Sequence, residues 1–238
     1  RYARMIAGGE RIPALDRRAQ WPEGVRTARE TPIGTEYVYG RSWRALPGPG
    51  PGSGTAHDGF PAWVPALLFS LAVVPLALLS SILWQSRGAG ILTAFLFALA
   101  PPIGAAAGGM ELAYESPAFA LIALHAWLVC LAARPQAGGG ARRRRAAALS
   151  APALFVALAV WQGTQLYLVL AAATLLARLI AGADDAGENA VGWATVAAAA
   201  AAGALVPFLR EGLFLVSPAA APVAGWAAAA LVLGRAPV

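Results

Sequence analysis

The stretch AWVPALLFSLAVVPLALLSSILWQ, residues 62–85, decides the fold class, because it carries no charged side chain along its whole length. A helix of about 20 apolar residues is long enough to cross a bilayer core about 30 Å thick. A continuous apolar run of this length indicates a helix that faces lipid rather than water. We therefore predict a transmembrane helix here.

Six further apolar stretches follow along the chain: 88–104, 117–133, 146–163, 164–182, 190–208 and 213–234. Pro218 and Pro222 lie in the last of them and could break it into a re-entrant piece. The chain is 58% hydrophobic and 13% charged, with a mean hydropathy of +0.60, whereas soluble domains are about a quarter charged. This composition excludes a soluble enzyme and a disordered tail. We predict an all-α fold, a polytopic membrane helix bundle with seven such segments over residues 62–238.

Residues 1–61 have a different character, with nine arginines and five acids among the first 44. The run PGPGPGSG, Pro47 to Gly54, has the composition of a linker, which neither a helix nor a central strand tolerates. All eighteen basic residues of the chain are arginine, so the net charge of +6 is not a lysine-rich arm for nucleic acid. We predict a separate loop segment over 1–61, and no nucleic-acid partner.

The arginines between the apolar stretches predict which side of the membrane each connection faces. Eight follow the odd-numbered stretches and one, Arg210, follows an even-numbered stretch. Positively charged loops stay in the cytoplasm, so the odd-numbered connections are predicted to be cytoplasmic and residues 1–61 extracytoplasmic. The eight are Arg87, Arg134, Arg142, Arg143, Arg144, Arg145, Arg178 and Arg235. The run 142–145 could also contact anionic membrane lipid, although a topology anchor needs no other role.

The sequence opens with Arg1 and contains no signal-peptide pattern, so we expect it to be part of a longer protein. Its single cysteine, Cys130, excludes a disulfide and a cysteine-based metal site. The alanine-rich, lysine-free composition is typical of a GC-rich prokaryote, which predicts an integral protein of a prokaryotic plasma membrane.

Acidic residues are the informative ones in so apolar a chain. Glu111 and Glu115 stand at i, i+4 on a short connection without nearby arginine, so in a helix their carboxylates would share one face. Such a pair favours a divalent cation, Mg²⁺ or Mn²⁺, between them. The alternative is a helix N-terminus that favours acids through its dipole. Asp184, Asp185 and Glu188 stand in a short cytoplasmic loop, where we expect them to be solvated.

His125 falls near the centre of the third apolar stretch. An ionisable side chain there is a functional candidate, but a neutral imidazole bonded to a neighbouring helix explains it equally, and we prefer that interpretation. Without lysine the chain has neither a Walker P-loop nor a Schiff-base nucleophile, and it contains no HExxH or Gly-x-Ser-x-Gly motif.

Several motifs, taken in order, resemble those of a known family. The first segment contains Gly8-Gly9, then Ile12-Pro13-Ala14-Leu15-Asp16, then Pro22-Glu23-Gly24. A helix ending in Ala-x-x-Pro, an acidic connection and another helix follow between Gly90 and Leu124, and WQGTQLYLVL comes later. This order resembles the N-terminal part of the catalytic subunits of oligosaccharyltransferase, which are multi-spanning GT-C glycosyltransferases.

The resemblance implies a metal-dependent transfer of a glycan from a polyprenyl (pyro)phosphate donor to the asparagine of an acceptor protein, on the extracytoplasmic face. It implies that Glu111, three residues after Gly108, and Glu115 are catalytic metal ligands. The pattern departs from the family at Ala113, where a second acid is usual, and at 104–107, which lack the usual arginine. The family's Trp-Trp-Asp acceptor motif is absent from this sequence, so we expect the fragment alone to be inactive.

Two other hypotheses stay open at the level of sequence. A GT-C transferase could use another acceptor, namely a hydroxyl, a lipid or a polymer. A non-enzymatic transporter could instead use His125 and the broken seventh stretch for its substrate or for protons.

Overall fold

The computed structural model describes residues 2–19, 23–45, 63–99, 115–134, 140–183 and 185–235. These residues are helical apart from turns, connections and one isolated antiparallel bridge between Asp16 and Val25. The helices are α1 (Tyr2–Gly8), α2 (Thr27–Glu30), α3 (Gly34–Ala45), α4 (Trp63–Ser70), α5 (Val73–Leu83), α6 (Arg87–Leu99), α8 (Glu115–Ala133), α9 (Gly140–Val160), α10 (Thr164–Ile180), α11 (Ala186–Leu205), α12 (Pro207–Glu211), the 3₁₀ helix η1 (Phe214–Val216) and α13 (Ala221–Val232). The predicted all-α fold class is confirmed for this part of the chain.

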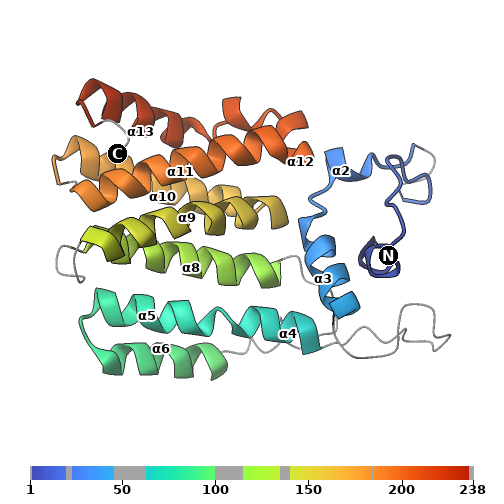
Figure 1. The fold of residues 1–238 in the computed structure, drawn as a ribbon, viewed down its shortest axis with the longest axis horizontal. Coiled ribbons are helices and arrows are strands. Elements are labelled where there is room, and N and C mark those ends of the chain that lie inside the picture. The colour runs from blue at the N-terminus through green and yellow to red at the C-terminus, as the bar shows by residue number, and fades with distance from the viewer. Residues whose placement is uncertain are drawn as a thin grey trace.

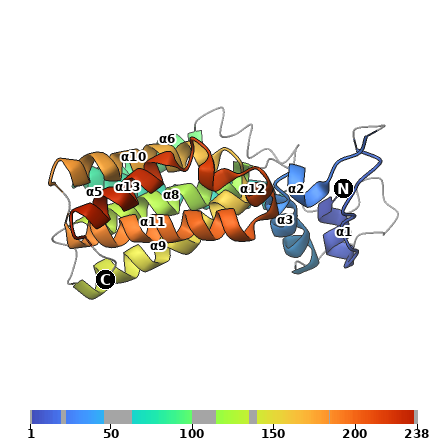
Figure 2. The ribbon, with the colours of Figure 1, turned by 90° about the horizontal axis from the view of Figure 1, so that it is seen from above.

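The long helices lie side by side in one bundle, along a common direction, and α1 to α3 stand at one end of it (Figures 1 and 2). Helix α8 packs along α9, α9 along α11, α5 along α6, and α10 along α13. Helices α5, α8 and α10 end, and α6, α9 and α11 begin, at the opposite end (Figure 1). We call the two ends the α3 end and the arginine end.

The arginine end holds the eight arginines that follow the odd-numbered stretches. Arg87 begins α6, Arg134 follows α8, Arg178 lies in the last turn of α10, and Arg235 follows α13. The run 142–145 lies in the first turns of α9. The exception, Arg210, lies in α12 at the α3 end (Figure 1). The connections between the bundle helices are therefore more basic at the arginine end, while the nine arginines of residues 1–44 belong to the N-terminal segment.

The deciding stretch, 62–85, forms two consecutive helices rather than one. Helix α4 ends at Ser70 and α5 begins at Val73, with a turn between them. Pro75 lacks the N–H that would bond the carbonyl of Leu71, and its ring crowds that carbonyl, so the regular ladder is interrupted here. Taken together, Val64–Leu83 is 20 residues long and apolar enough to cross a membrane.

The described residues of the other six stretches are also largely helical, but none of these helices, as far as the structure describes them, meets the same measure of length and hydropathy. Helices α6, α10 and α13 are shorter, as is the apolar part of α8, Pro117–Ala133. In the seventh stretch Leu213 has a φ of 54°, η1 follows, and α13 begins only after Pro218. The break expected near the two prolines is therefore present.

Small residues let these helices approach one another closely. A side chain at Gly192 of α11 would collide with the Trp226 ring of α13. Trp226 is buried and meets Trp193 edge to face, with 5.5 Å between ring centroids. Glycine at a helix contact replaces side-chain bulk by close backbone approach, as in helix pairs packed within lipid.

The N-terminal segment, residues 2–45 where described, packs on the α3 end of the bundle. Gly34 begins α3 directly against the backbone carbonyl of Ala159, where any side chain would collide. Thr35 donates its hydroxyl hydrogen bond to the carbonyl oxygen of Val160 at 3.0 Å. On the other side, Arg29 of α2 lies 3.8 Å from Glu211 of α12. Backbone contacts and hydrogen bonds thus join the segment to the ends of α9 and α12.

Candidate functional site

One of the two predicted metal ligands, Glu115, falls at the α3 end of the bundle. Glu111 lies outside the described residues, and Glu115 is the first residue of α8, whose side-chain position also lies outside the description. The start of α8 is at the same end as α3 (Figure 1). Among the described residues, no three His, Cys, Asp or Glu side chains gather where they could hold a metal ion. The metal site stays a prediction.

His125 is completely buried in the bundle, near the middle of α8. Its Nδ1 atom lies 2.6 Å from the hydroxyl oxygen of Tyr167 in α10, and the two rings meet edge to face. This contact confirms the preferred interpretation of His125 as an imidazole that is hydrogen-bonded to a neighbouring helix. It joins α8 to α10 inside an apolar interior, where the other ring nitrogen of His125, Nε2, is buried without a hydrogen-bond partner among the described residues.

Two of the acids expected to be solvated, Asp185 and Glu188, are instead bound to arginines from other helices, so that expectation is wrong for them. The third, Asp184, lies outside the described residues. Glu188 is buried, with 6% of its surface exposed, and its two oxygens accept hydrogen bonds from Nε of Arg178 at 2.8 and 2.9 Å. The second Arg178 nitrogen lies 2.7 Å from the same carboxylate and donates to the carbonyl oxygen of Ala183 at 3.0 Å. A two-pronged contact of this kind is among the stronger ion pairs in proteins.

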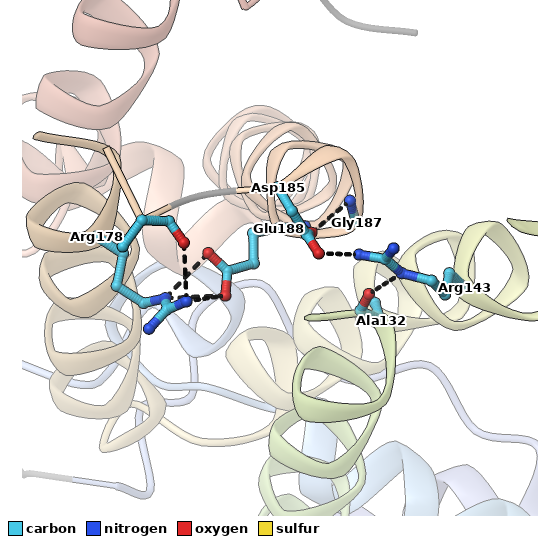
Figure 3. A network of polar contacts seen from close by, with 7 residues as sticks. Ala132, Arg143, Arg178, Asp185, Gly187 and Glu188 are labelled. Atoms are coloured by element: carbon cyan, nitrogen blue, oxygen red, sulfur yellow. Dashed lines mark hydrogen bonds and ion pairs between the residues drawn. The ribbon is translucent and has the colours of Figure 1, made fainter. Parts of the chain in front are cut away.

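A second ion pair stands beside it (Figure 3). Arg143 of α9 donates to a carboxylate oxygen of Asp185 and, through Nε, to the carbonyl oxygen of Ala132 at 2.7 Å. The other Asp185 oxygen accepts from the backbone N–H groups of Gly187 and Glu188 at 2.8 and 3.0 Å. Asp185 therefore caps the first turn of α11 and at the same time fixes α9 and the end of α8.

These bonds determine the protonation of Asp185. Burial by itself would raise the pKa of this carboxyl group. The hydrogen bond from the Glu188 N–H, the hydrogen bond and positive charge of Arg143, and the Gly187 N–H together outweigh burial and lower the pKa below its ordinary value. Asp185 is consequently held in its charged form.

The sequence holds a local signal for half of this arrangement. Asp185-Ala186-Gly187-Glu188 has an N-cap residue followed three positions later by glutamate, the pattern of a capping box. In the structure Glu188 turns away from the cap and binds Arg178. The partners of both acids lie in other helices, which are 10 and 42 positions away along the chain.

At the α3 end, the ion pairs that Glu211 makes with Arg29 and Arg210 are exposed. Glu211 lies 3.5 Å from Arg210, as expected of an interfacial pair, with more than a third of each side chain exposed. Asp16 is buried in the N-terminal segment, where it accepts from the Tyr2 hydroxyl at 2.8 Å and from the Arg18 N–H at 2.9 Å. The cluster of arginines in this segment makes up most of its charge.

Comparison with known proteins gives no relative. No family model matches the chain, and no curated protein matches it.

Proposed function

We propose that this chain is an integral membrane protein whose bundle spans the bilayer several times. The support is the distribution of polarity over the bundle. Large apolar side chains point outward along it, for example Ile91 at 72% exposed, Leu166 at 68% and Ile180 at 70%. Polar side chains such as His125, Ser150 and Thr195 are inside. Soluble monomers rarely expose apolar surface on this scale, whereas lipid would cover it.

The orientation that we propose places the arginine end in the cytoplasm and the α3 end outside. The arginines of the connections between the bundle helices support it, because basic residues close to a span are retained on the cytoplasmic side. The nine arginines of residues 1–44 lie about 18 residues or more before the first apolar stretch, where this bias fades. Several helices are shorter than a full membrane span, which is still compatible with the proposed bundle. A multi-spanning bundle can contain helices with a polar segment at one end and helices that are tilted or broken.

We propose further that the α3 end carries a glycosyltransferase site. The transferred glycan would leave the phosphate of a polyprenyl lipid donor and join the side-chain nitrogen of an asparagine in an acceptor protein. The observation that carries the proposal is the meeting of two chain regions at one end of the bundle. The N-terminal segment, where the resemblance to oligosaccharyltransferase begins, docks on the same end at which Glu115 begins α8.

Glu111 and Glu115 are the residues that would hold the proposed divalent metal, Mn²⁺ or Mg²⁺. Carboxylate oxygens suit these ions, and a bound ion would offset the negative charge of the donor phosphate. The described residues supply no further ligand cluster, so no catalytic step is assigned to the ion.

The non-enzymatic alternative loses one of its supports. A transporter based on His125 needs that side chain to be available to a substrate or a proton path. The imidazole is fully buried and bound to Tyr167, which is what a helix-to-helix contact requires. The proposal of a transferase with a different acceptor remains a variant of the same site.

The test is a transfer assay on the full-length gene product in membranes, with a lipid-linked glycan and an Asn-x-Ser/Thr peptide. We expect Glu111→Gln to lower transfer by about 100-fold or more, because a metal ligand contributes several kcal/mol to the transition state. Glu30→Gln, which removes a charge from the exposed surface of α2 and belongs to none of the motifs that carry the resemblance, is the matched control and should retain transfer.

Three results would separate the hypotheses. Equal transfer by the wild type and Glu111→Gln would overturn the assignment of Glu111. Transfer to a hydroxyl acceptor but not to the peptide would retain the transferase and change its acceptor. The family that the chain resembles carries an aspartate in its first external loop, which would lie just before Arg1. Absence of any transfer, together with a flanking gene sequence that lacks both this aspartate and a Trp-Trp-Asp motif, would overturn the transferase proposal.

A further inference from the structure

The N-terminal segment contains a cleft of about 580 Å³ that none of the predicted site residues line. Its walls come from three parts of the segment: the end of α1 with the connection after it, α2, and one face of α3. The volume lies in the range of sites for small molecules, about 300–1,000 Å³, and is larger than a simple inorganic ion needs.

Four arginines line this cleft, against one carboxylate. Arg11 comes from the connection after α1, Arg29 from α2, and Arg41 and Arg44 from α3, while Glu10 is the acid. The lining therefore carries a net charge of +3, from four positive groups and one negative group. Like charges gathered in one hollow repel each other and create a strong positive potential inside it.

The helical spacing shows that α3 directs one stripe of side chains at the cleft. Tyr37, Arg41 and Arg44 all line it, and they follow one another at intervals of four and three residues. Residues so spaced share one helix face, and two arginines three positions apart disfavour the helix slightly by repulsion. No contact within the helix explains why Arg41 and Arg44 share a face. An anion bound in the cleft would explain it, because both guanidinium groups could then bind the anion.

These arginines are not used by the structure itself. Among the described residues, Arg11, Arg41 and Arg44 form no ion pair or side-chain hydrogen bond, and all three are exposed. Arg29 has only the long contact with Glu211 at 3.8 Å, with 56% of its side chain exposed. Exposed pairs at such a distance contribute little. The guanidinium groups are consequently available to a ligand.

We propose that this cleft binds a phosphorylated saccharide or a similarly sized polar phosphate ester. Guanidinium groups bind phosphate oxygens through paired, charge-assisted hydrogen bonds, and several of them converge here. The Tyr37 ring and the apolar Ile12 and Ile33 offer surface to a sugar ring, and Glu10 can accept a hydrogen bond from a hydroxyl group. The ligand is either a free sugar phosphate or the headgroup of an anionic lipid, which share this chemistry. The site does not depend on the proposed transferase activity, since Glu111 and Glu115 are not among its lining residues.

The experiment measures binding of glucose 1-phosphate to the full-length protein in nanodiscs of neutral phosphatidylcholine, with glucose as the uncharged probe. We expect saturable binding of the phosphate ester and weaker binding of glucose. The double variant Arg41→Ala/Arg44→Ala should bind glucose 1-phosphate at least about ten-fold more weakly, because each charge-assisted bond contributes more than 1 kcal/mol.

The matched control is Arg17→Ala/Arg18→Ala, which removes the same charge from two exposed positions of the same segment that do not line the cleft. It should bind as the wild type does. Equal weakening by both double variants would overturn the proposal, because binding would then follow net charge alone. Absence of saturable binding by a wild type with normal helical circular dichroism would also overturn it.

A second set of nanodiscs, which contain phosphatidylglycerol, distinguishes the two sources of the ligand. If the lipid headgroup occupies the cleft, phosphatidylglycerol will weaken the binding of glucose 1-phosphate by the wild type more than by the cleft variant Arg41→Ala/Arg44→Ala. The control variant Arg17→Ala/Arg18→Ala should respond to phosphatidylglycerol as the wild type does. If the affinity of the wild type is unchanged, the cleft serves a soluble phosphate ester. Both results support the site, and its dependence on Arg41 and Arg44 decides the proposal.

Discussion

The two ends of the bundle use arginine in opposite ways. At the arginine end, Arg178 and Arg143 are bound to carboxylates and carbonyls and join neighbouring helices (Figure 3). At the α3 end, Arg41 and Arg44 reach into a cleft without a partner among the described residues. Arginine therefore joins helices where it is bound to a carboxylate of another helix. Where an arginine has no such ion pair, its guanidinium group stays available to an external anion.

The sidedness of the two ends gives the largest expected effect. In a Cys130→Ala background, we expect a cysteine at Ala45, exposed at the end of α3, to react with a membrane-impermeant maleimide in intact cells. A cysteine at the exposed Ala183, beside α11 at the arginine end, should react only after the cells are opened. Labelling of both positions in intact cells would contradict the orientation.

Removal of a cross-link should break the arginine end more than any other single change. We expect Arg178→Ala to lower the free energy of unfolding by about 3 kcal/mol, because it leaves the buried Glu188 carboxylate unpaired. The measurement is denaturant unfolding in detergent micelles, followed by circular dichroism. Arg178→Ala/Glu188→Gln should recover part of the loss, since the buried charge is then gone. A loss no larger than that of Arg41→Ala, at the other end, would contradict the contrast.

Acid should weaken the arginine end in a way that reports Asp185. Its pKa is lowered in the folded protein, so its stabilising effect is complete above the unfolded value of about 3.9 and is lost as the pH falls toward the folded value. Asp185→Asn should remove this component and cost about 1 kcal/mol at neutral pH through the weakened helix cap. Melting temperatures of the wild type and of Asp185→Asn, measured from pH 7 down to the pH at which the wild type unfolds, check both the acid dependence and the cost of the substitution at neutral pH. An unchanged acid dependence in Asp185→Asn would assign it to other carboxyl groups.

Hydropathy predicts the helices well, because a run without charges has few other stable forms in an apolar setting. The stretch 117–133 lies within α8 and 164–182 begins with α10. The break near Pro75 and the break before α13 both follow from the chemistry of proline and not from hydropathy. The seven-span bundle is a finer statement than these helices support, because within the described part of the chain only Val64–Leu83 meets the measure of length and hydropathy.

The site was harder to predict because its contacts join distant parts of the chain. Glu188 and Asp185 stand in a sequence of alanine and glycine that is typical of a solvated loop. Only the packing of α9, α10 and α11 brings Arg143 and Arg178 to them. His125 was placed correctly, since a lone imidazole in an apolar run needs a hydrogen-bonding partner. The spacing of Arg41 and Arg44 in the sequence is compatible with one helix face, but the sequence does not show that this face lines a cleft.

The close contact between Gly34 and the backbone of Ala159 also has a consequence for the synthesis of the chain. Thr35 and Val160, which are hydrogen-bonded beside this contact, lie 125 positions apart along the chain. A ribosome that adds about 5–20 residues per second needs on the order of ten seconds to make the intervening chain. During that interval the N-terminal segment has no docking surface, since α9 has not yet emerged. Docking of the N-terminal segment on the end of α9 is therefore a late step of synthesis, because it can follow only after α9 has been made.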